Sequence, residues 1–215
     1  MKCVILANGE YNNLVKYLSL IEEADIILGA DGGANYAYAM GVIPYAIVGD
    51  MDSLRPEAGK YFQQQGVKFK RFPSRKDFTD TQLTLALAEE MGANEIILCG
   101  SVGKRLDHTL ANLYSGIELA LKGVKICHYT DNFSAYLVTR EIIINGEPGD
   151  TVSVLAISDL AQGVSGEGFE YPLNNLRLKK SNPYAISNIL IASRGIIRVK
   201  EGLLLVLHYP DSKEL

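Results

Sequence analysis

The sequence predicts an α/β protein with an N-terminal, largely parallel α/β sandwich domain over residues 1–131, followed by a C-terminal all-β sandwich domain over residues 132–215. Two observations lead to this prediction. Before residue 132, short apolar runs alternate with segments of helical periodicity, which is typical of βαβ units and a parallel sheet. After residue 131, strand-like segments follow one another between turn signals, and no long helical pattern appears.

Composition narrows the class of protein. The chain has 215 residues, of which 47% are hydrophobic and 21% charged, and this balance excludes disorder. No apolar run approaches about 18 residues and no secretory signal precedes the first turn, so we expect no membrane segment and a cytoplasmic location. The three cysteines lie in apolar runs, as reduced core thiols do. With 21 basic and 25 acidic residues, no general affinity for nucleic acid is expected.

Strands and helices alternate in the first domain. The apolar runs suit strands buried on both faces, and they lie at residues 3–7, 24–28, 46–48, 67–72, 95–99 and 124–129. The helical segments lie at 14–23, 34–40, 56–65, 79–91 and 107–122. Pro56 suits a first helical turn, and Thr79 with Gln82 forms a capping-box pattern at the start of the fourth helix. In the fifth helix, the residues expected to face the core are Leu110, Leu113, Ile117 and Leu121.

The second domain is expected to contain strands without long helices. These strands lie at residues 133–139, 141–144, 151–156, 189–192, 195–199 and 202–209. Turn signals such as Asn145-Gly146 and Pro148-Gly149 separate them. Short strands at this spacing favour a β-sandwich.

Polar segments follow four of the strands predicted in the first domain. They are Gly29–Gly33, Gly49–Ser53, Ser74–Asp80 and Gly100–His108. Because ligands bind beyond the carboxyl ends of the strands in an open parallel sheet, these segments should converge on one edge. Together they carry carboxylates, glycines and basic residues.

Asp50 and Asp52 are the sharpest pair of candidate ligands. Carboxylate oxygens on a tight loop suit Mg²⁺, which proteins hold through one or two carboxylates and substrate phosphates. A solvated polar turn would show the same short pattern. Asp77 and Asp80 flank a predicted helix start, where the helix dipole stabilises acids that have no further function.

The segment Gly100–Arg105 offers backbone N–H groups and two cations directly before a helix, as a phosphate-binding loop does. Its spacing is not that of a Walker A loop, and an ordinary turn between a strand and a helix would share its composition. Its place beside carboxylates favours a site for a metal-bound nucleotide. Three roles stay open for His108: phosphate contact, acid–base group or helix-start residue. His128 and His208 lie in strands and are most simply structural.

With these segments assembled, the chain resembles the bacterial thiamine pyrophosphokinase family over nearly its whole length. The motifs occur in the family's order and at its spacing: Ala30-Asp31-Gly32-Gly33-Ala34, Gly49-Asp50-Met51-Asp52-Ser53, Asp77-Phe78-Thr79-Asp80-Thr81 and Gly103-Lys104-Arg105-Leu106-Asp107-His108. In the second domain, Gly168–Leu173 and Ile186-Ser187-Asn188 resemble the family's segments on the thiamine side.

The resemblance implies a Mg²⁺-dependent transfer of diphosphate from ATP to the hydroxyl of thiamine, which yields AMP and thiamine diphosphate. It also implies an ATP-binding first domain and a thiamine-binding second domain. The expected assembly is a homodimer with the thiamine sites at the interface between subunits.

Roles for individual residues follow from the same resemblance. The metal and catalytic positions are Asp50, Asp52 and Asp77, and either Asp77 or Asp80 orients the thiamine hydroxyl or accepts its proton. The ATP-binding positions are Asp31, Gly32, Gly33, Arg75, Gly103, Lys104, Arg105, Asp107 and His108. The substrate-binding positions are Thr79, Gln82, Ser187 and Asn188.

Two positions depart from the family pattern. Lys104 stands where the family's loop commonly has glycine. Arg75 stands where an acid is often found, which either removes a metal ligand or adds a phosphate contact. Two other functions would use the same residues: a metal-dependent nucleotide phosphohydrolase with water as the nucleophile, and a non-catalytic sensor of nucleotide or thiamine diphosphate.

Overall fold

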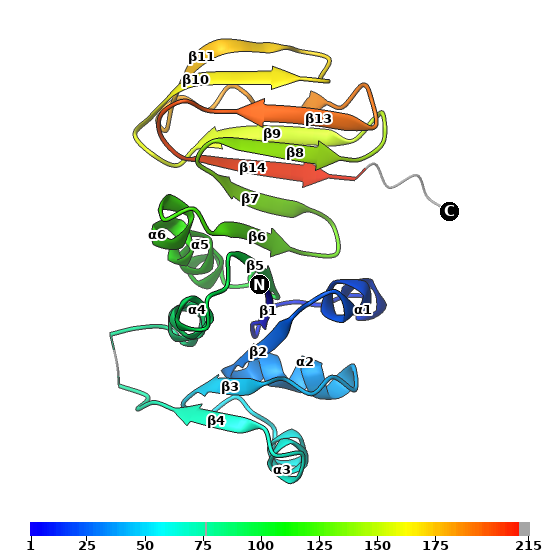
Figure 1. Cartoon of the computed structure of the whole chain (residues 1–215), viewed down its shortest axis with the longest axis vertical. Coiled ribbons are helices and arrows are strands. Elements are labelled where there is room, and N and C mark those ends of the chain that lie inside the picture. Colours follow the sequence, from blue (N-terminus) through cyan, green and yellow to red (C-terminus); the bar gives the residue numbers. More distant parts are fainter. Residues whose placement is uncertain (76, 211–215) are drawn as a thin grey trace. The chain divides into compact units, whose positions relative to one another are not determined.

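The computed structural model describes residues 1–75 and 77–210 and divides into two compact units, Met1–Asp131 and Asn132–Leu215 (Figure 1). The first unit is an α/β domain and the second is built from antiparallel strands, so the predicted fold class is confirmed. Within the described ranges, no helix combines the length and apolar character needed to cross a membrane.

A parallel sheet forms the centre of the first unit. Its strands pair in the order β6-β5-β1-β2-β3-β4, and every pairing among them is parallel. The strands are β1 (Lys2–Leu6), β2 (Ile26–Ala30), β3 (Ala46–Gly49), β4 (Lys68–Arg71), β5 (Glu95–Cys99) and β6 (Lys125–Tyr129). The chain adds β2, β3 and β4 outward from one side of β1 and then returns to its other side with β5 and β6. The order of the strands therefore reverses between β1 and β5.

Helices cover both faces of this sheet (Figure 1). On one face lie α1 (Val15–Glu22), α2 (Ala34–Ala39) and α3 (Pro56–Gln64), and on the other lie α4 (Asp80–Glu90), α5 (Leu106–Ser115) and α6 (Ile117–Leu121). Val4 and Leu6 of β1 share one apolar cluster with Tyr17 of α1 and Phe62 of α3. Burial of such side chains is the main source of stability for these short helices.

The capping box predicted at the start of the fourth helix is confirmed. The Thr79 hydroxyl accepts a hydrogen bond from the Gln82 backbone N–H at 3.2 Å, and the Gln82 side-chain carbonyl accepts one from the Thr79 N–H at 2.8 Å. These two bonds satisfy donors that a helix N-terminus would otherwise leave unpaired. The start of α4 is therefore well defined.

The single helix expected at 107–122 is wrong, because the structure has two helices, α5 and α6, that meet at Gly116. Glycine has a low helix propensity, so ending a helix at this residue costs little free energy. The predicted inward face is wrong as well, because α5 has no buried residue and the exposed fractions of Leu110 and Leu121 are 40% and 65%. The expectation of burial on both faces also fails for β4, an edge strand whose Lys68, Lys70 and Arg71 are exposed.

Two groups of four antiparallel strands make up the second unit. The pairing orders are β12-β9-β14-β7 and β11-β10-β13-β8. The strands are β7 (Ser134–Val138), β8 (Glu141–Asn145), β9 (Thr151–Ala156), β10 (Leu160–Glu167), β11 (Leu173–Lys179), β12 (Asn188–Ile189), β13 (Arg194–Arg198) and β14 (Leu204–Tyr209). Both groups contribute to one apolar core, as in a sandwich: Val154 and Val206 come from the first group, and Val164 and Ile197 from the second.

Sequence patterns did not predict β10 and β11. The register shifts on both sides of Val164, and Gly163 there has a φ of +68°. A bulge of this kind breaks the alternation of inward and outward side chains by which strands are recognised.

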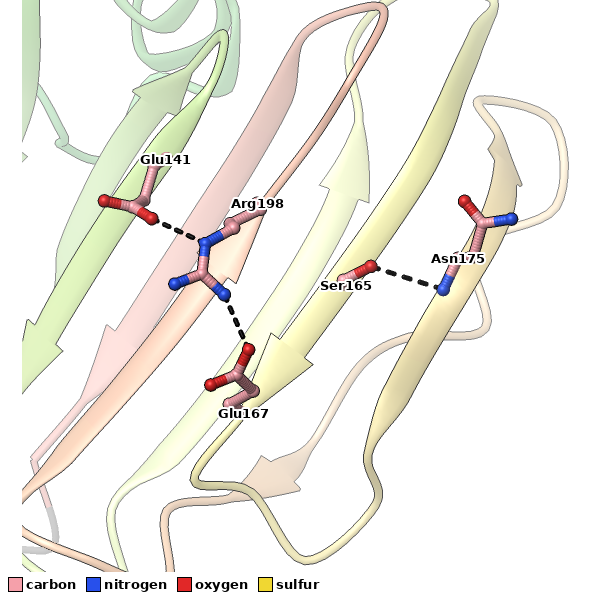
Figure 2. A network of polar contacts seen from close by, with 5 residues as sticks. All are labelled: Glu141, Ser165, Glu167, Asn175 and Arg198. Atoms are coloured by element: carbon pink, nitrogen blue, oxygen red, sulfur yellow. Dashed lines mark hydrogen bonds and ion pairs between the residues drawn. The ribbon is translucent and has the colours of Figure 1, made fainter.

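A polar network ties neighbouring strands on the outer surface of this unit (Figure 2). The Arg198 guanidinium donates to Glu141 on β8 and to Glu167 on β10, both at 2.6 Å. The Ser165 hydroxyl accepts the Asn175 backbone N–H at 3.3 Å and so joins β10 to β11. Because these side chains are exposed, the ion pairs align the strands more than they stabilise the domain.

A close approach at Gly33 predicts a large effect of a small substitution. A Cβ atom at this position would overlap the carbonyl group of Leu6 at the end of β1, so we expect Gly33→Ala to lower the free energy of unfolding by about 3 kcal/mol or more. Gly59→Ala in α3 is the matched control, because its Cβ would lie 3.4 Å from Leu54 Cδ2, an ordinary contact, and alanine favours a helix. Urea unfolding measures both. Equal stability of Gly33→Ala and wild type would contradict this contact.

Candidate functional site

A pocket of about 780 Å³ lies in the first unit at the carboxyl ends of the parallel strands. It spans the point between β1 and β5 where the strand order reverses, which is where open α/β sheets bind ligands. The predicted convergence of four polar segments is confirmed, because the segments after β2, β3, β4 and β5 all line the pocket. The lining residues that figure in the site are Asn8, Gly9, Glu10, Asp31, Asp50, Asp52, Ser53, Thr79, Asp80, Ser101, Gly103, Lys104, Arg105, His108, Thr109 and Asn112.

The loop after β1 also lines the pocket, and sequence patterns had treated it only as a turn. The Glu10 backbone N–H donates to the Val102 carbonyl at 2.9 Å, which joins this loop to the loop after β5. Gly9 makes the approach possible, because a Cβ atom there would overlap the Gly100 and Val102 carbonyl groups. The signal that could have placed this loop in the site is its position, directly after the central strand.

Three carboxylates gather on one side of the pocket. Asp31, Asp50 and Asp52 each offer an oxygen such that these atoms lie within 4.8 Å of one another. Asp31 follows β2 with a φ of +44°, and Met51 between the other two acids has a φ of +69°. The Asp50 carboxylate accepts the Asp52 backbone N–H at 3.1 Å, and the Ser53 hydroxyl donates to Asp52 at 2.8 Å. The backbone therefore holds the three acids together although their charges repel one another.

Asp31 is the buried member of this cluster, with an exposed fraction of 6%, and its Oδ1 has no hydrogen-bond partner among the described residues. Burial raises the pKa of the Asp31 carboxyl, and the charges of Asp80 and Asp52 raise it further, against hydrogen bonds from Gly32 and Ser53 that lower it. A buried carboxylate oxygen without a donor is costly. A divalent cation would complete its coordination, so the donor set fits a hard metal ion such as Mg²⁺.

Gly49 lets a fourth carboxylate approach the cluster. With its φ of +148°, a Cβ at this position would lie 2.9 Å from Asp31 Cβ and 3.0 Å from Asp80 Oδ1. Asp80 opens α4 and lines the pocket, as does Thr79. Several predicted site residues are not among the described residues that line the pocket: Gly32, Gly33, Arg75, Asp77, Gln82 and Asp107. Asp77 also lies outside the three-carboxylate group.

Helix α5 holds the loop after β5 in place. The Asn112 side-chain amide donates to the Ser101 carbonyl at 2.8 Å, and the Thr109 hydroxyl accepts the Gly103 backbone N–H at 3.2 Å. Sequence patterns missed Thr109 and Asn112. Their position in the sequence could have indicated this role, because both lie on the first turns of the helix that follows the glycine-rich segment.

Three basic residues predicted to contact phosphate line the pocket. Lys104 and Arg105 come from this loop, and His108 comes from the start of α5. The Arg105 guanidinium binds both carboxylate oxygens of Asp107, at 2.6 Å and 3.2 Å, and this pairing lowers the pKa of Asp107 to about 2. Since both side chains are exposed, Arg105 can exchange this partner for a phosphate group.

A buried histidine lies beside the same loop. His128 on β6 is fully buried, and its Nδ1 lies 3.0 Å from the Ser101 hydroxyl oxygen. Burial lowers the pKa of His128 to about 4, so the ring is neutral at pH 7. Its position in a strand had indicated a structural role, and nothing in the local sequence pairs it with Ser101.

Ser187 and Asn188, predicted to bind substrate, lie in the second unit. Ser187 is exposed with a φ of +58°, and its backbone N–H donates to the Ser153 hydroxyl at 3.0 Å. Asn188 is buried, and its side-chain amide bonds to both the N–H and the carbonyl of Tyr171, at 3.0 Å and 2.6 Å. Asn188 therefore fixes the backbone that carries the exposed Tyr171 ring.

A parallel α/β domain whose pocket at the strand reversal combines carboxylates, glycines and cations is typical of enzymes that bind nucleotides with a metal ion. Two sequence profiles make the assignment specific. The profile described as "Thiamin pyrophosphokinase, catalytic domain" matches residues 17–128, and the one described as "Thiamin pyrophosphokinase, vitamin B1 binding domain" matches residues 140–204. The chain belongs to the thiamine pyrophosphokinase family.

Individual relatives agree with the profiles. The chain is 27% identical to a thiamine pyrophosphokinase of Bacillus subtilis, over 98% of this chain and 100% of the relative. It is 30% identical to thiamine pyrophosphokinase 3 of Oryza sativa, over 84% of this chain and 76% of the relative. The crystal structure of thiamine pyrophosphokinase from Bacillus subtilis superposes with a TM-score of 0.86 at 26% identity, over 98% of this chain and 100% of the other.

The lowered pKa of His128 predicts a loss of stability in mild acid. The folded-state pKa of about 4 lies below the ordinary value of 6.5, so the unfolded chain binds the extra proton. The neutral His128 ring contributes fully to the free energy of unfolding above pH 6.5, and this contribution is lost as pH falls toward 4. The free energy of unfolding should therefore fall by about 2 kcal/mol between pH 7 and pH 5. Urea unfolding at several pH values in this range should show that the free energy of unfolding depends less steeply on pH for His128→Asn than for wild type. Parallel slopes would contradict a neutral buried ring.

Proposed function

We propose that this chain transfers the diphosphate group of ATP to the hydroxyl of thiamine, and that the first-unit pocket is the site of the reaction. This transfer is the reaction of the thiamine pyrophosphokinase family, which uses ATP as a substrate. The observation that carries the proposal is the cluster of Asp31, Asp50 and Asp52 in the same pocket as the glycine-rich loop. The buried Oδ1 of Asp31 has no hydrogen-bond partner among the described residues. One wall offers carboxylates for a cation and the other offers donors for phosphate.

Asp31, Asp50 and Asp52 are the residues that would hold Mg²⁺. Bound there, the cation would neutralise phosphate charge as a Lewis acid. We retain Asp77 as a proposed further ligand on the strength of the family resemblance, while the geometry of the described residues favours Asp31 in its place. In either arrangement, the bound cation would offset the repulsion among the clustered carboxylates. It would also stabilise the charged form of Asp31, which burial disfavours.

The phosphate groups would bind along the loop after β5. Backbone N–H groups of this loop and the N-terminus of α5, a helix of ten residues, favour an anion at this point. Arg105, with Lys104 or Arg75, would balance the charge that develops on the transferred group and on the AMP leaving oxygen. His108 lines the same wall and is proposed as a further phosphate contact.

The chemical step needs a positioned hydroxyl and a proton acceptor. The thiamine hydroxyl oxygen would attack the β-phosphorus, the bond between this phosphorus and the oxygen bridging to the α-phosphate would break, and AMP would leave. Asp77 or Asp80 would take the hydroxyl proton. Asp80 lines the pocket, whereas Asp77 is not among the described residues that line it, which supports Asp80 for the role. No covalent enzyme intermediate is required, since positioning and electrostatics account for most such catalysis.

Thiamine would contact Thr79 and Gln82 in the first unit and Ser187 and Asn188 in the second, in a homodimer whose thiamine sites lie at the interface between subunits. The exposed Leu106, Leu110 and Tyr114 on α5 support the homodimer, because they suit an apolar surface covered by a second copy. We also propose a cytoplasmic location, which the three cysteines support, since they lie in apolar runs as reduced core thiols do.

A product assay tests the proposed reaction. Purified protein with ATP, Mg²⁺ and thiamine should form AMP and thiamine diphosphate in equal amounts, and neither when thiamine is left out. Chromatography separates AMP, ADP and thiamine diphosphate. AMP formed at the same rate without thiamine would indicate a phosphohydrolase, ADP would indicate transfer of a single phosphate, and nucleotide binding without turnover would indicate a sensor. Each of these three outcomes overturns the proposal.

The carboxylate cluster gives a second prediction. Asp50→Asn and Asp31→Asn should each lower kcat/KM by about 100-fold or more, because each removes a negative charge that would hold the cation. Asp159→Asn, which changes an exposed acid between β9 and β10, is the matched control and should leave activity unchanged. Steady-state kinetics over a range of Mg²⁺ concentrations measures the effect. Near-normal activity of Asp50→Asn would remove Asp50 from the metal site.

A further inference from the structure

Ser101 lies between the pocket and the buried His128. It directly follows β5, lines the pocket and has an exposed fraction of 1%. Its carbonyl is held by the Asn112 amide at 2.8 Å and its hydroxyl by His128 Nδ1 at 3.0 Å. Both backbone and side chain are thus fixed from the protein side. The direction of the hydrogen bond to His128 decides what the hydroxyl can offer to a ligand.

The surroundings of His128 decide that direction. A neutral imidazole carries one N–H, and the other ring nitrogen, Nε2, has no hydrogen-bond partner in the described part of the chain. If Nε2 carried the proton, a buried N–H would have no acceptor, whereas a bare Nε2 leaves only an unused acceptor. Orphaned buried N–H groups are the rarer and costlier of the two. The proton therefore belongs on Nδ1, which donates to the Ser101 oxygen.

This tautomer leaves the Ser101 hydroxyl proton without an acceptor. Among the described residues, the hydroxyl makes its hydrogen bond to His128 and to no other side chain or backbone group. Ser101 lines the pocket, as do Gly103, Lys104 and Arg105 of the same loop. A ligand acceptor there would satisfy the hydroxyl, and the cations beside it select an anionic one.

We propose that Ser101 is a phosphate-binding residue that donates its hydroxyl proton to an oxygen of the bound nucleotide, and that His128 is the positioning residue that keeps this proton free by donating from Nδ1. The inference deepens the proposed function, on which it rests for the identity of the ligand. The ring's low pKa is consistent with it, because a neutral His128 has a single proton to give.

The tautomer can be observed directly. Two-bond ¹H–¹⁵N correlation spectra of wild-type protein labelled at histidine distinguish a protonated Nδ1 with a bare Nε2 from the opposite arrangement. We expect the first pattern for His128 at pH 7, assigned by its absence from His128→Asn. A proton on Nε2, or on both nitrogens, would overturn the proposal whether or not the protein turns over thiamine.

Binding of a nucleotide tests the role of the hydroxyl. Calorimetry with Mg²⁺ and the ATP analogue that has a methylene group between the α- and β-phosphates should show about tenfold weaker binding for Ser101→Ala. Ser115→Ala is the matched control and should bind with the affinity of wild type. In the described part of the chain, the Ser115 hydroxyl bonds to the Ala111 carbonyl alone, and Ser115 does not line the pocket. Equal affinity of Ser101→Ala and wild type would overturn the proposal.

A double-mutant cycle tests the route through His128. His128→Phe should weaken binding about as much as Ser101→Ala, and the double variant should show no further loss, because both changes remove the same donor. His128→Asn should bind within about threefold of wild type, since its amide N–H can replace Nδ1–H. Additive losses in the cycle would show that His128 acts independently of Ser101.

Kinetics separates positioning from simple structural damage. Ser101→Ala should raise the KM for ATP about tenfold with kcat within about threefold of wild type, as expected when an interaction is made equally in the ground and transition states. A lower kcat with an unchanged KM would mark a loss of folded protein and would overturn the assignment. If wild type binds the analogue but does not turn over thiamine, the proposed reaction fails while the assignment of Ser101 and His128 is still decided by binding.

Discussion

The site depends on one topological constraint, the reversal of strand order between β1 and β5. Both strands pair in parallel at the centre of the sheet, so the chain leaves their carboxyl ends at the same edge. The segments then lead to helices on opposite faces, α1 after β1 and α5 after β5 (Figure 1). The pocket lies at this point, and both loops line it, joined by the bond from the Glu10 N–H to the Val102 carbonyl.

The same edge of the sheet brings several carboxylates together, which destabilises the folded state and must be offset by packing elsewhere in the domain. Ala30 of β2 pairs with Val48 of β3, so the acids that follow these strands come side by side. Positive φ angles at Asp31 and Met51, together with the missing side chain of Gly49, hold this arrangement. Non-glycine residues in this region of φ and like charges at short range both raise the energy of the folded state. Such strain is common where a protein holds a cation or a reacting group.

The opposite wall follows a different principle. Its donors are backbone groups and side chains held by partners behind them: Asn112 and His128 fix Ser101, and Thr109 fixes Gly103. Preorganised donors lose little entropy when a charged ligand binds. The carboxylates of the first wall repel phosphate and would meet it only with a cation between them. The two walls therefore complement each other for a polyphosphate and its counter-ion.

Local patterns predicted the features that local forces control. The bounds of β5 and β9 and the capping box of Thr79 and Gln82 came out as the structure has them, because alternation, propensity and capping act over a few residues. Patterns failed where a local signal was overridden. Gly163 breaks the alternation of β10, and Gly116 divides an apparently continuous helix. Leu106, Leu110 and Tyr114 of α5 are exposed although their side chains are apolar or aromatic.

The sequence by itself therefore determined the fold class, most elements and the acids, glycines and cations of the candidate site, since strand ends in a parallel sheet share one edge. Only the tertiary structure decided which of these residues meet. It brought Asp31, rather than Asp77, to Asp50 and Asp52, and it set His128 against Ser101, 27 residues away in the chain. The physical reason is that such contacts depend on strand order and register, which long-range packing selects and no short stretch of sequence encodes.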